Sequence, residues 1–552
     1  MVRTLIVLLI AAALSLGYWF WRGQAVPVAE LPAADLKLQC VSYAPFRRPG
    51  ETPFDESARV SRERIEQDLR LLQTVSNCVR IYSVDQGLAA VPAVARQLEM
   101  KVLLGAWLGR EPKRNDTELD AAIALAREYG DVVVALIVGN EVLLRRELPA
   151  EAIARYLDKA RASVDVPVTY ADVWEFWLRH QELAKKVSFA TIHILPYWED
   201  EPVAIDQAVE HVLNIVGHVQ QTMPGVKLMI GETGWPSVGR SRRAAVPGLV
   251  NQARFVREFA NAAPRLGVPY NFIEGFDQPW KRRLEGAMGG YWGLLDSDGL
   301  QKFPLQGPVL ADPGWRDGVR YGSGAGALAL LLLLPWLLRR PVQVSIKTKL
   351  LQWLGAGAAA IIAGSLLTAQ WRYLQHWNRD WLEWAVTLAF SLAGLVLFVL
   401  VTGIALRFRY FGLLPQPGRR DVAYERVSSR LVTCLAALRL LILFGAAVLM
   451  TLLVFDARYR GFPWPTYALP LLAFGLLALS RINLDSISLQ QRVLAWIISV
   501  SALPILIHEH GANWEASAFV LLMLLLAALA VRFDYRLSRT NNPAIAPTAA
   551  NS

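Results

Sequence analysis

Hydrophobic and polar positions alternate in two different ways along the chain. Residues 23–320 contain short apolar runs separated by polar or amphipathic stretches, whereas residues 321–532 consist mostly of long apolar runs. Another apolar run, Thr4–Phe20, precedes both regions. Because the long runs match the hydrocarbon thickness of a bilayer, the sequence predicts a membrane-embedded helical region and one substantial soluble domain.

The soluble region contains eight short strand-like runs, most of them separated by stretches with helical spacing of apolar residues, such as Ser61–Val75 and Asp116–Tyr129. Strand–helix alternation predicts a parallel sheet. Eight repeats between Leu36 and about Pro313 fit an α/β fold that closes into a (β/α)8 TIM barrel. The expected strands are Lys37–Tyr43, Cys78–Tyr82, Lys101–Trp107, Val132–Val138, Pro167–Tyr170, Phe189–Ile194, Lys227–Ile230 and Tyr270–Gly275.

Eight apolar segments are candidate membrane spans. Seven follow Thr4–Phe20, near 321–338, 349–370, 382–406, 433–455, 464–480, 493–509 and 514–531. Basic residues concentrate on one side of these spans, which places that side and both termini in the cytoplasm. Residues 23–320 then lie on the periplasmic side of a bacterial inner membrane. The basic side carries Arg339, Arg340, Lys347, Lys349, Arg407, Arg409, Arg419, Arg420, Arg426, Arg430, Arg481, Arg492, Arg532, Arg536 and Arg539, against Arg372, Arg379, Arg458 and Arg460 opposite.

The expected domains are therefore an anchor (1–22), a periplasmic barrel (23–320), a seven-helix transmembrane domain (321–532) and a cytoplasmic tail (533–552). The first span ends in aromatic residues suited to the membrane boundary, which favours an uncleaved anchor over a signal peptide. Arg439 is the clear ionisable residue deep in a span, and we expect it to snorkel to the cytoplasmic boundary. The sequence therefore predicts anchoring and indicates no transport mechanism.

Composition narrows the possible functions. Hydrophobic residues make up 54% of the 552 residues and charged residues 19%, which excludes a disordered chain. Much of the net charge of +10 lies between the apolar runs, so we expect no nucleic-acid partner. Three cysteines are too few for a zinc site of four thiolates, and no metal-ligand spacing or cofactor motif is present. Strand alternation counted from Tyr43 and Arg80 places Cys40 and Cys78 on opposite faces, so we expect no disulfide.

In a TIM barrel, chemistry takes place where the strands end. Nearly every expected strand here ends in a polar or aromatic residue. Aromatic rings stack on the apolar faces of sugars, and carboxylates and amides bind sugar hydroxyls. These rim residues are Tyr43, Arg80, Tyr82, Trp107, Asn140, Glu141, Tyr170, Tyr197, Trp198, Glu232, Phe276, Asp277 and Trp280.

Two of the rim residues form a candidate catalytic pair. Glu141 follows the fourth expected strand and Glu232 the seventh, so they face each other across the barrel. Cleavage of a glycosidic bond needs one carboxyl group to protonate the departing oxygen and a second to stabilise or capture the sugar cation. The alternative is that each glutamate only caps the helix that follows its strand. The pair, with Asn140 and Gly231 directly before it, favours the catalytic interpretation.

These residues resemble glycoside hydrolase family 17, the β-1,3-glucanase family. The resemblance is carried by Asn140-Glu141, by Gly231–Ser237 (Gly-Glu-Thr-Gly-Trp-Pro-Ser) and by Val79–Tyr82. The segments Phe276–Lys281 and Tyr291–Leu294 resemble the family's strand-eight region. The similarity covers about residues 36–312.

The resemblance implies roles for these side chains. Glu232 would be the nucleophile and Glu141 the acid/base. Arg80 and Asn140 would hold the nucleophile and the sugar 2-hydroxyl, and Tyr197 would lie beside the nucleophile. The expected substrate-binding residues are Tyr43, Arg80, Tyr82, Asn140, Tyr197, Trp198, Trp235, Phe276, Trp280 and Lys281.

Some residues depart from the pattern of plant members. The first strand reads Val41–Phe46 in place of a Gly-Tyr-Gly-type start, and the sixth carries His193 and Trp198. We expect His193 to be a packed or hydrogen-bonded barrel residue. The anchor and C-terminal helices make the chain similar to bacterial membrane-bound members, which are associated with remodelling β-1,3-glucans into β-1,6-linked or branched periplasmic glucans.

The sequence therefore predicts a retaining glucanosyltransferase that acts on β-1,3-glucan at a lipid bilayer, without a cofactor and beside a separate membrane glucan synthase. The chain lacks the Gln-x-x-Arg-Trp motif of processive synthases. Two alternatives stay open: an endo-1,3-β-glucosidase, and a non-catalytic glucan-binding or export partner. Trp198, Trp235, Trp280 and Trp292 fit either acceptor or donor subsites.

Overall fold

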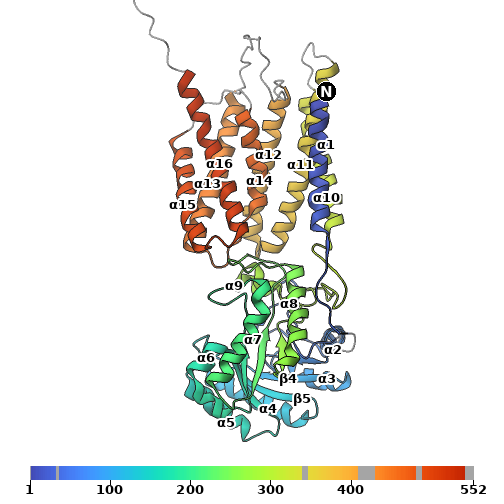
Figure 1. Ribbon diagram of the computed structural model, residues 1–552, viewed down its shortest axis with the longest axis vertical. Coiled ribbons are helices and arrows are strands. Elements are labelled where there is room, and N and C mark those ends of the chain that lie inside the picture. The colour runs from blue at the N-terminus through green and yellow to red at the C-terminus, as the bar shows by residue number, and fades with distance from the viewer. Residues whose placement is uncertain (1, 33–36, 339–345, 408–428, 480–487, 541–552) are drawn as a thin grey trace, which may run out of the picture. The chain divides into compact units, whose positions relative to one another are not determined.

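The computed structural model describes residues 2–32, 37–338, 346–407, 429–479 and 488–540 (Figure 1). These residues form two compact units. Residues 25–311 make up one unit, and residues 1–24 together with 312–552 make up the other. Several arginines used to orient the spans lie outside the described residues: Arg339, Arg340, Arg409, Arg419, Arg420, Arg426 and Arg481.

The first unit is a closed barrel of eight parallel strands, which confirms the predicted fold. Each strand pairs with the next along the chain, and the last pairs with the first. The strands are β2 (Val41–Ser42), β3 (Cys78–Arg80), β4 (Lys101–Ala106), β5 (Val133–Asn140), β6 (Val168–Val173), β7 (Ala190–His193), β8 (Leu228–Thr233) and β9 (Tyr270–Phe272). Two short strands, β1 (Ala25–Val26) and β10 (Val309–Leu310), pair antiparallel outside the barrel.

Amphipathic helices connect the strands because one face of each is apolar. In α7, for example, Ala208, Val212, Val216 and Val219 recur at helical spacing and are buried. The connecting helices are α2 (Arg62–Leu72), α3 (Val91–Gln97), α4 (Pro112–Glu128), α5 (Ala150–Arg161), α6 (Trp174–Arg179), α7 (Ile205–Thr222) and α8 (Leu249–Ala262), followed by the short α9 (Arg282–Glu285).

The second unit is a bundle of long helices that lie side by side in Figure 1. They are α1 (Val2–Arg22), α10 (Trp315–Leu338), α11 (Ile346–Trp377), α12 (Trp381–Arg407), α13 (Ser429–Phe455), α14 (Trp464–Leu479), α15 (Leu489–His508) and α16 (Trp514–Thr540). By length and composition, six of the described helices are able to cross a membrane. The apolar parts of α14 and α16, Trp464–Ala478 and Trp514–Ala530, are shorter.

Polar contacts join α1 to the bundle. Trp19 of α1 is 2% exposed, and its indole N–H donates to the hydroxyl of Ser365 in α11. Asp312 accepts from Arg22 at the end of α1, at 3.3 Å, and from the Arg372 guanidinium of α11, at 2.7 and 2.8 Å. The expected snorkelling of Arg439 is wrong. This side chain is 3% exposed, and its guanidinium lies 5.7 Å from the ring centre of Phe474 in α14, so it faces the interior of the bundle.

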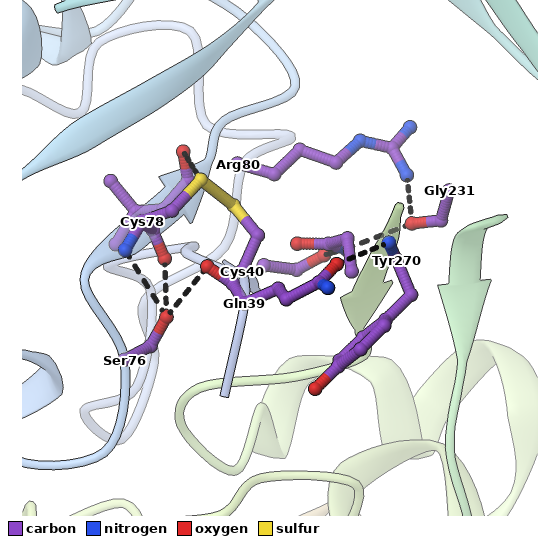
Figure 2. Close-up of a disulfide and its surroundings, with 10 residues drawn as sticks. Gln39, Cys40, Ser76, Cys78, Arg80, Gly231 and Tyr270 are labelled. Atoms are coloured by element: carbon purple, nitrogen blue, oxygen red, sulfur yellow. Dashed lines mark hydrogen bonds between the residues drawn. A yellow bond between two sulfur atoms is a disulfide. The ribbon is translucent and has the colours of Figure 1, made fainter. Parts of the chain in front are cut away.

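The barrel contains a disulfide between Cys40 and Cys78, which contradicts the sequence prediction (Figure 2). The prediction failed because it took Tyr43 as the inward-facing residue of the first strand. The register pairs Ser42 with Arg80, and it is Ser42 that faces inward, donating or accepting a hydrogen bond at the Tyr82 hydroxyl.

Cys40 therefore has the same parity as Ser42, and Cys78 the same parity as Arg80, so both cysteines point into the barrel. Their Cα atoms lie 4.4 Å apart. Around them is an apolar cluster formed by Leu103, Ala135, Ile137, Ala171 and Met229. The disulfide thus joins the first two barrel strands within this interior cluster.

Two measurements test the disulfide. Denatured, unreduced protein should contain one reactive thiol, that of Cys434, because Cys40 and Cys78 are oxidised. The double variant Cys40→Ala/Cys78→Ala should lose roughly 3–4 kcal/mol of unfolding free energy, since the bond closes a long loop in the unfolded chain. Cys434→Ala is the matched control and should unfold like the wild type. Three reactive thiols in unreduced protein would contradict the disulfide.

Candidate active site

Irregular strand pairing positions Glu232 at the end of β8. Ile192 of β7 pairs with Ile230, but the next residue, His193, pairs with Glu232. Gly231 is therefore an extra residue in β8, and such bulges re-aim the side chains beside them. The result is that Glu232 and His193 lie next to each other on neighbouring strands.

Only glycine fits at this bulge. A Cβ atom on Gly231 would lie 2.4 Å from Cγ2 of Thr191 and 3.0 Å from the imidazole ring of His193. Both distances are shorter than van der Waals contact, so the glycine of the Gly-Glu-Thr-Gly-Trp-Pro motif is required by close packing. This explains why the motif begins with glycine.

A second irregularity positions Glu141. Ile137 of β5 pairs with Thr169, and Asn140 pairs with Ala171, so the strand gains one residue over its partner. Gly139 lies within this stretch with a φ of +86°. The chain then turns at Glu141, whose own φ is +50°, and the backbone N–H of Glu141 donates to the carbonyl of Ala171.

The buried guanidinium of Arg80 connects the two glutamates. Its side chain is 1% exposed and extends across the barrel interior. It donates to the Asn140 side-chain oxygen at 2.5 Å, to the Gly231 carbonyl at 2.7 Å and to Glu232 Oε1 at 3.3 Å. It also lies 3.4 Å from Nε2 of His193. Figure 2 shows the bond from Arg80 to Gly231.

Glu232 accepts two hydrogen bonds at the same oxygen. In addition to Arg80, the Tyr82 hydroxyl donates to Glu232 Oε1 at 2.8 Å. The Tyr82 hydroxyl also lies 2.8 Å from the Ser42 hydroxyl, which accepts from the side-chain amide of Asn271. Burial, followed by the neighbouring Glu232 charge, raises the pKa of Tyr82 well above its ordinary value, so this phenol remains a donor.

Glu141 faces Glu232 and is the more accessible of the two. Its side chain is 22% exposed, compared with 6% for Glu232. Nδ1 of His193 lies 2.9 Å from Glu141 Oε1 and 3.8 Å from Glu232 Oε2. One ligand-type atom from each of these three side chains falls within 4.8 Å of the others. The two carboxyl groups are therefore close neighbours.

Opposing effects act on the acidity of Glu141. Burial favours its neutral form, but the hydrogen bond from His193 and the positive charges of Arg80 and Arg145 hold the pKa of Glu141 below its ordinary value. Glu141 is consequently biased toward the carboxylate.

Asp172 of β6 supports the turn that carries Glu141. Its carboxylate accepts from the Tyr170 hydroxyl and, at 3.1 Å, from the backbone N–H of Leu143. Burial raises the pKa of Asp172 to about 6, and the nearby Glu141 charge adds to this effect. Asp172 thus links the β6 strand to the segment after β5.

Two lysine–carboxylate pairs lie at the end of β9. Lys281 Nζ donates to both oxygens of Glu274 at 2.8 Å, and Lys302 Nζ donates to Asp277 at 2.8 Å. Burial raises the pKa of Glu274 to about 7 and that of Asp277 to about 6, against the opposing lysines. These pairs fix the segment after β9 beside the site.

Five of the predicted site residues meet in this network: Arg80, Tyr82, Asn140, Glu141 and Glu232. Trp198 and Trp280 are half-buried. The Arg242 guanidinium lies 5.2 Å from the Trp198 ring centre, and Trp280 packs edge-on against the exposed Phe54. Lys281 is engaged with Glu274, as described above.

Four predicted residues lie outside the network. The Tyr43 hydroxyl donates to Asp68 of α2, and its ring packs against Phe276, which is 0% exposed. Trp235 is 1% exposed, with its ring stacked on Phe255 of α8. The Tyr197 hydroxyl donates to the Arg240 carbonyl. Each of these rings therefore packs within the barrel wall or its loops.

Sequence reasoning expected His193 to be a packed or hydrogen-bonded barrel residue, which it is, but did not place it in the site. It missed Ser42, Asn271 and Glu274. Ser42 pairs with Arg80 in the register of β2 and β3, so a correct register would have identified Ser42 as inward-facing. His193 and Glu274 lie near the ends of expected strands, where a titratable residue indicates a candidate site residue. The bulge at Gly231 that brings His193 to Glu232 has no marker in hydrophobic patterning.

Comparison with known proteins is consistent with this geometry. Residues 40–293 match the family described as the BtgE/BtgC glycoside hydrolase domain. The Glucan 1,3-beta-glucosidase of Schizosaccharomyces pombe is 28% identical over 255 residues, which cover 43% of this chain and 79% of that protein. The beta-glucosidase btgE of Aspergillus fumigatus, a probable assignment by its name, is 25% identical over 226 residues.

The btgE alignment covers 40% of this chain and 39% of btgE, so this chain spans less than half of that protein. Among solved structures, a glycoside hydrolase family 17 beta-1,3-glucanosyltransferase from Rhizomucor miehei has 25% sequence identity and a TM-score of 0.43. That similarity covers 48% of this chain and 95% of the other. The helical unit that follows residue 311 lies beyond the matched residues 40–293.

The matched residues include both glutamates, the bulge at Gly231 and the strands that form the site. Through its barrel, the chain therefore matches the BtgE/BtgC glycoside hydrolase domain over residues 40–293.

Proposed function

We propose that the chain is a retaining β-1,3-glucan-active enzyme that transfers glucanosyl units to a glucan acceptor. One observation carries this proposal: a buried glutamate, Glu232, bonded to Arg80 and Tyr82, faces the more accessible Glu141 at close range. The names of the relatives support β-1,3-glucan as the substrate class.

The short separation favours retention of configuration. In retaining glycosidases the two carboxyl groups are about 5–5.5 Å apart, whereas inverting enzymes leave about 6.5–9.5 Å for a water molecule. Oxygen atoms of Glu141 and Glu232 lie within 4.8 Å of each other. This spacing is on the short side of the two ranges and fits a carboxylate nucleophile.

The proposed reaction has two steps. Glu232 attacks the anomeric carbon while Glu141 protonates the departing oxygen, and a covalent glucosyl-enzyme forms. Glu141, now a carboxylate, then takes a proton from the acceptor hydroxyl as this attacks the anomeric carbon and releases Glu232. Arg80 and Tyr82 bind Glu232 throughout and keep its other oxygen available for the sugar.

The acceptor determines the product. A water acceptor gives an endo-1,3-β-glucosidase, which is the alternative within the same chemistry, and a sugar hydroxyl gives transfer. The half-buried rings of Trp198 and Trp280 are suited to retain an acceptor sugar, since aromatic faces stack on sugar C–H groups. A new β-1,6 linkage or branch would then form when the acceptor hydroxyl is the 6-hydroxyl.

The helical unit supports a location in a bacterial inner membrane, with the barrel in the periplasm and both termini in the cytoplasm. Six described helices are long and apolar enough to span a bilayer. The same proposal includes the anchor at 1–22 and the domain boundaries at 320 and 532. It also includes a separate membrane glucan synthase as a partner.

The identity and role of Glu232 can be tested by product analysis. Full-length protein in detergent is incubated with laminari-oligosaccharides, and product sizes and linkages are followed by mass spectrometry and NMR. We expect products longer than the substrate. Glu232→Gln should lower kcat by at least about 10³-fold, because the nucleophile is lost. The exposed Glu151→Gln is the control and should remain active. Exclusively shorter products would identify a hydrolase, and an active Glu232→Gln would exclude this nucleophile.

The role of Glu141 can be tested with an activated substrate. With a 2,4-dinitrophenyl β-laminarioligoside, Glu141→Ala should still release dinitrophenol in a burst, because this leaving group needs no proton. Steady-state turnover should fall by roughly 10²–10⁴-fold for lack of a general base. Azide should restore turnover and give a β-glycosyl azide. An α-azide, or no rescue, would contradict the assignment.

The membrane orientation can be tested by protease accessibility. In intact bacterial spheroplasts, protease should degrade the barrel of a C-terminally tagged chain and leave the tag protected, because basic loops remain cytoplasmic. Permeabilised spheroplasts are the control, in which the tag should also be lost. Loss of the tag from intact spheroplasts would reverse the proposed orientation.

A further inference from the structure

His193 is buried between the two glutamates of the site. Its ring is 0% exposed at the end of β7, and it lies beside Glu232 through the bulge at Gly231. Nδ1 is 2.9 Å from Glu141 Oε1, and Nε2 is 3.4 Å from the Arg80 guanidinium. Each ring nitrogen therefore has one partner within hydrogen-bond distance. The partner of Nδ1 is a carboxylate, which accepts, and the partner of Nε2 is a guanidinium, which donates.

The partners determine where the imidazole proton resides. A guanidinium has only donors, so Nε2 has to be the acceptor of the Arg80 N–H. The proton of a neutral imidazole is then on Nδ1, where it points to Glu141. A proton on Nε2 would set two donors against each other and leave Nδ1 facing a carboxylate lone pair.

The same reasoning bears on metal binding. Glu141, His193 and Glu232 are close enough to surround a cation. A cation bound at Nδ1 would require the proton to move to Nε2, against the Arg80 guanidinium. The arrangement favours an N–H donor at Nδ1 over a metal ligand.

We propose that His193 is a positioning residue that donates its Nδ1 proton to Glu141, with Arg80 selecting the tautomer, and so prepares Glu141 to act as the general base of the second step. This inference rests on the proposed function and adds to it a residue that the catalytic pair does not include. The lowered pKa of Glu141 agrees with a donated hydrogen bond.

The effect on the reaction differs between the two steps. In the glucosyl-enzyme, Glu141 is a carboxylate, and the His193 N–H orients it toward the acceptor. In the first step Glu141 has to be protonated. The same donor lowers the pKa of Glu141, which makes it a stronger acid but reduces the fraction of enzyme in which it is protonated. The charged and titratable groups around His193 are Arg80 on β3, Glu141 after β5, Asp172 on β6 and Glu232 on β8.

Two variants of full-length protein in detergent separate donation from packing. His193→Phe keeps a ring but has no donor, whereas His193→Asn places an amide N–H near the position of Nδ1 without a titratable group. With the dinitrophenyl laminarioligoside, His193→Phe should slow turnover by roughly 10–100-fold, as expected for loss of a hydrogen bond to a charged group. Azide should restore its turnover, and His193→Asn should stay within a few-fold of the wild type.

The pH profile gives an independent readout. Loss of the donor raises the pKa of Glu141, and kcat/KM for laminari-oligosaccharides needs protonated Glu141. The alkaline limb of kcat/KM should therefore move to higher pH in His193→Phe and stay near its original position in His193→Asn. Equal losses in both variants, without azide rescue or a shifted limb, would mean that His193 only fills space and would overturn the inference.

The tautomer can be measured without substrate. In protein labelled with ¹⁵N-histidine, the NMR signals that disappear in His193→Phe should show a protonated Nδ1 and an unprotonated Nε2. A protonated Nε2 would overturn the inference whatever the activity. An inactive wild-type protein would instead defeat the proposed function, and the tautomer measurement would still decide whether His193 donates to Glu141.

Discussion

The site depends on one buried cation in the barrel interior. Arg80 donates to a strand carbonyl, to the amide oxygen of Asn140 and to the carboxylate of Glu232, and it approaches Nε2 of His193. Removing one member of a buried ionic pair typically costs about 3–5 kcal/mol, because the other charge stays buried without compensation. Arg80 is therefore the buried partner of the Glu232 carboxyl group, and the arrangement of the site depends on this pair.

Backbone irregularities and this cation act together. The bulge at Gly231 aims Glu232 at the barrel axis, and the extra residue near Gly139 turns the chain so that Glu141 faces it. Regular strands would alternate their side chains between the interior and the helices. The two bulges interrupt that alternation at Glu141 and Glu232, so both carboxylates point toward each other. The hydrogen bonds around Arg80 hold this arrangement.

The electrostatic environments of the two glutamates differ in a way that suits different roles. Glu232 is almost fully buried and accepts from a phenol and a guanidinium, which suits the nucleophile role proposed for it. Glu141 is more exposed, accepts from a histidine and can exchange its proton with an incoming or departing sugar. Two identical side chains thus acquire different environments from their neighbours, which fits the separate roles proposed for them.

The sequence by itself determined the closed eight-stranded barrel, the helical region with its apolar helices, the resemblance of the barrel to glycoside hydrolases, and the positions of the two glutamates. The period-two and helical patterns and the Gly-Glu-Thr-Gly-Trp-Pro motif are local features, so they can be recognised from the sequence alone.

Strand register is not a local feature. The inward face of the first strand was taken as Tyr43 when it is Ser42, and this single step in parity concealed the Cys40–Cys78 disulfide. Only the tertiary structure brought His193 between the glutamates, because a bulge shifts register without changing the hydrophobic pattern that the sequence displays.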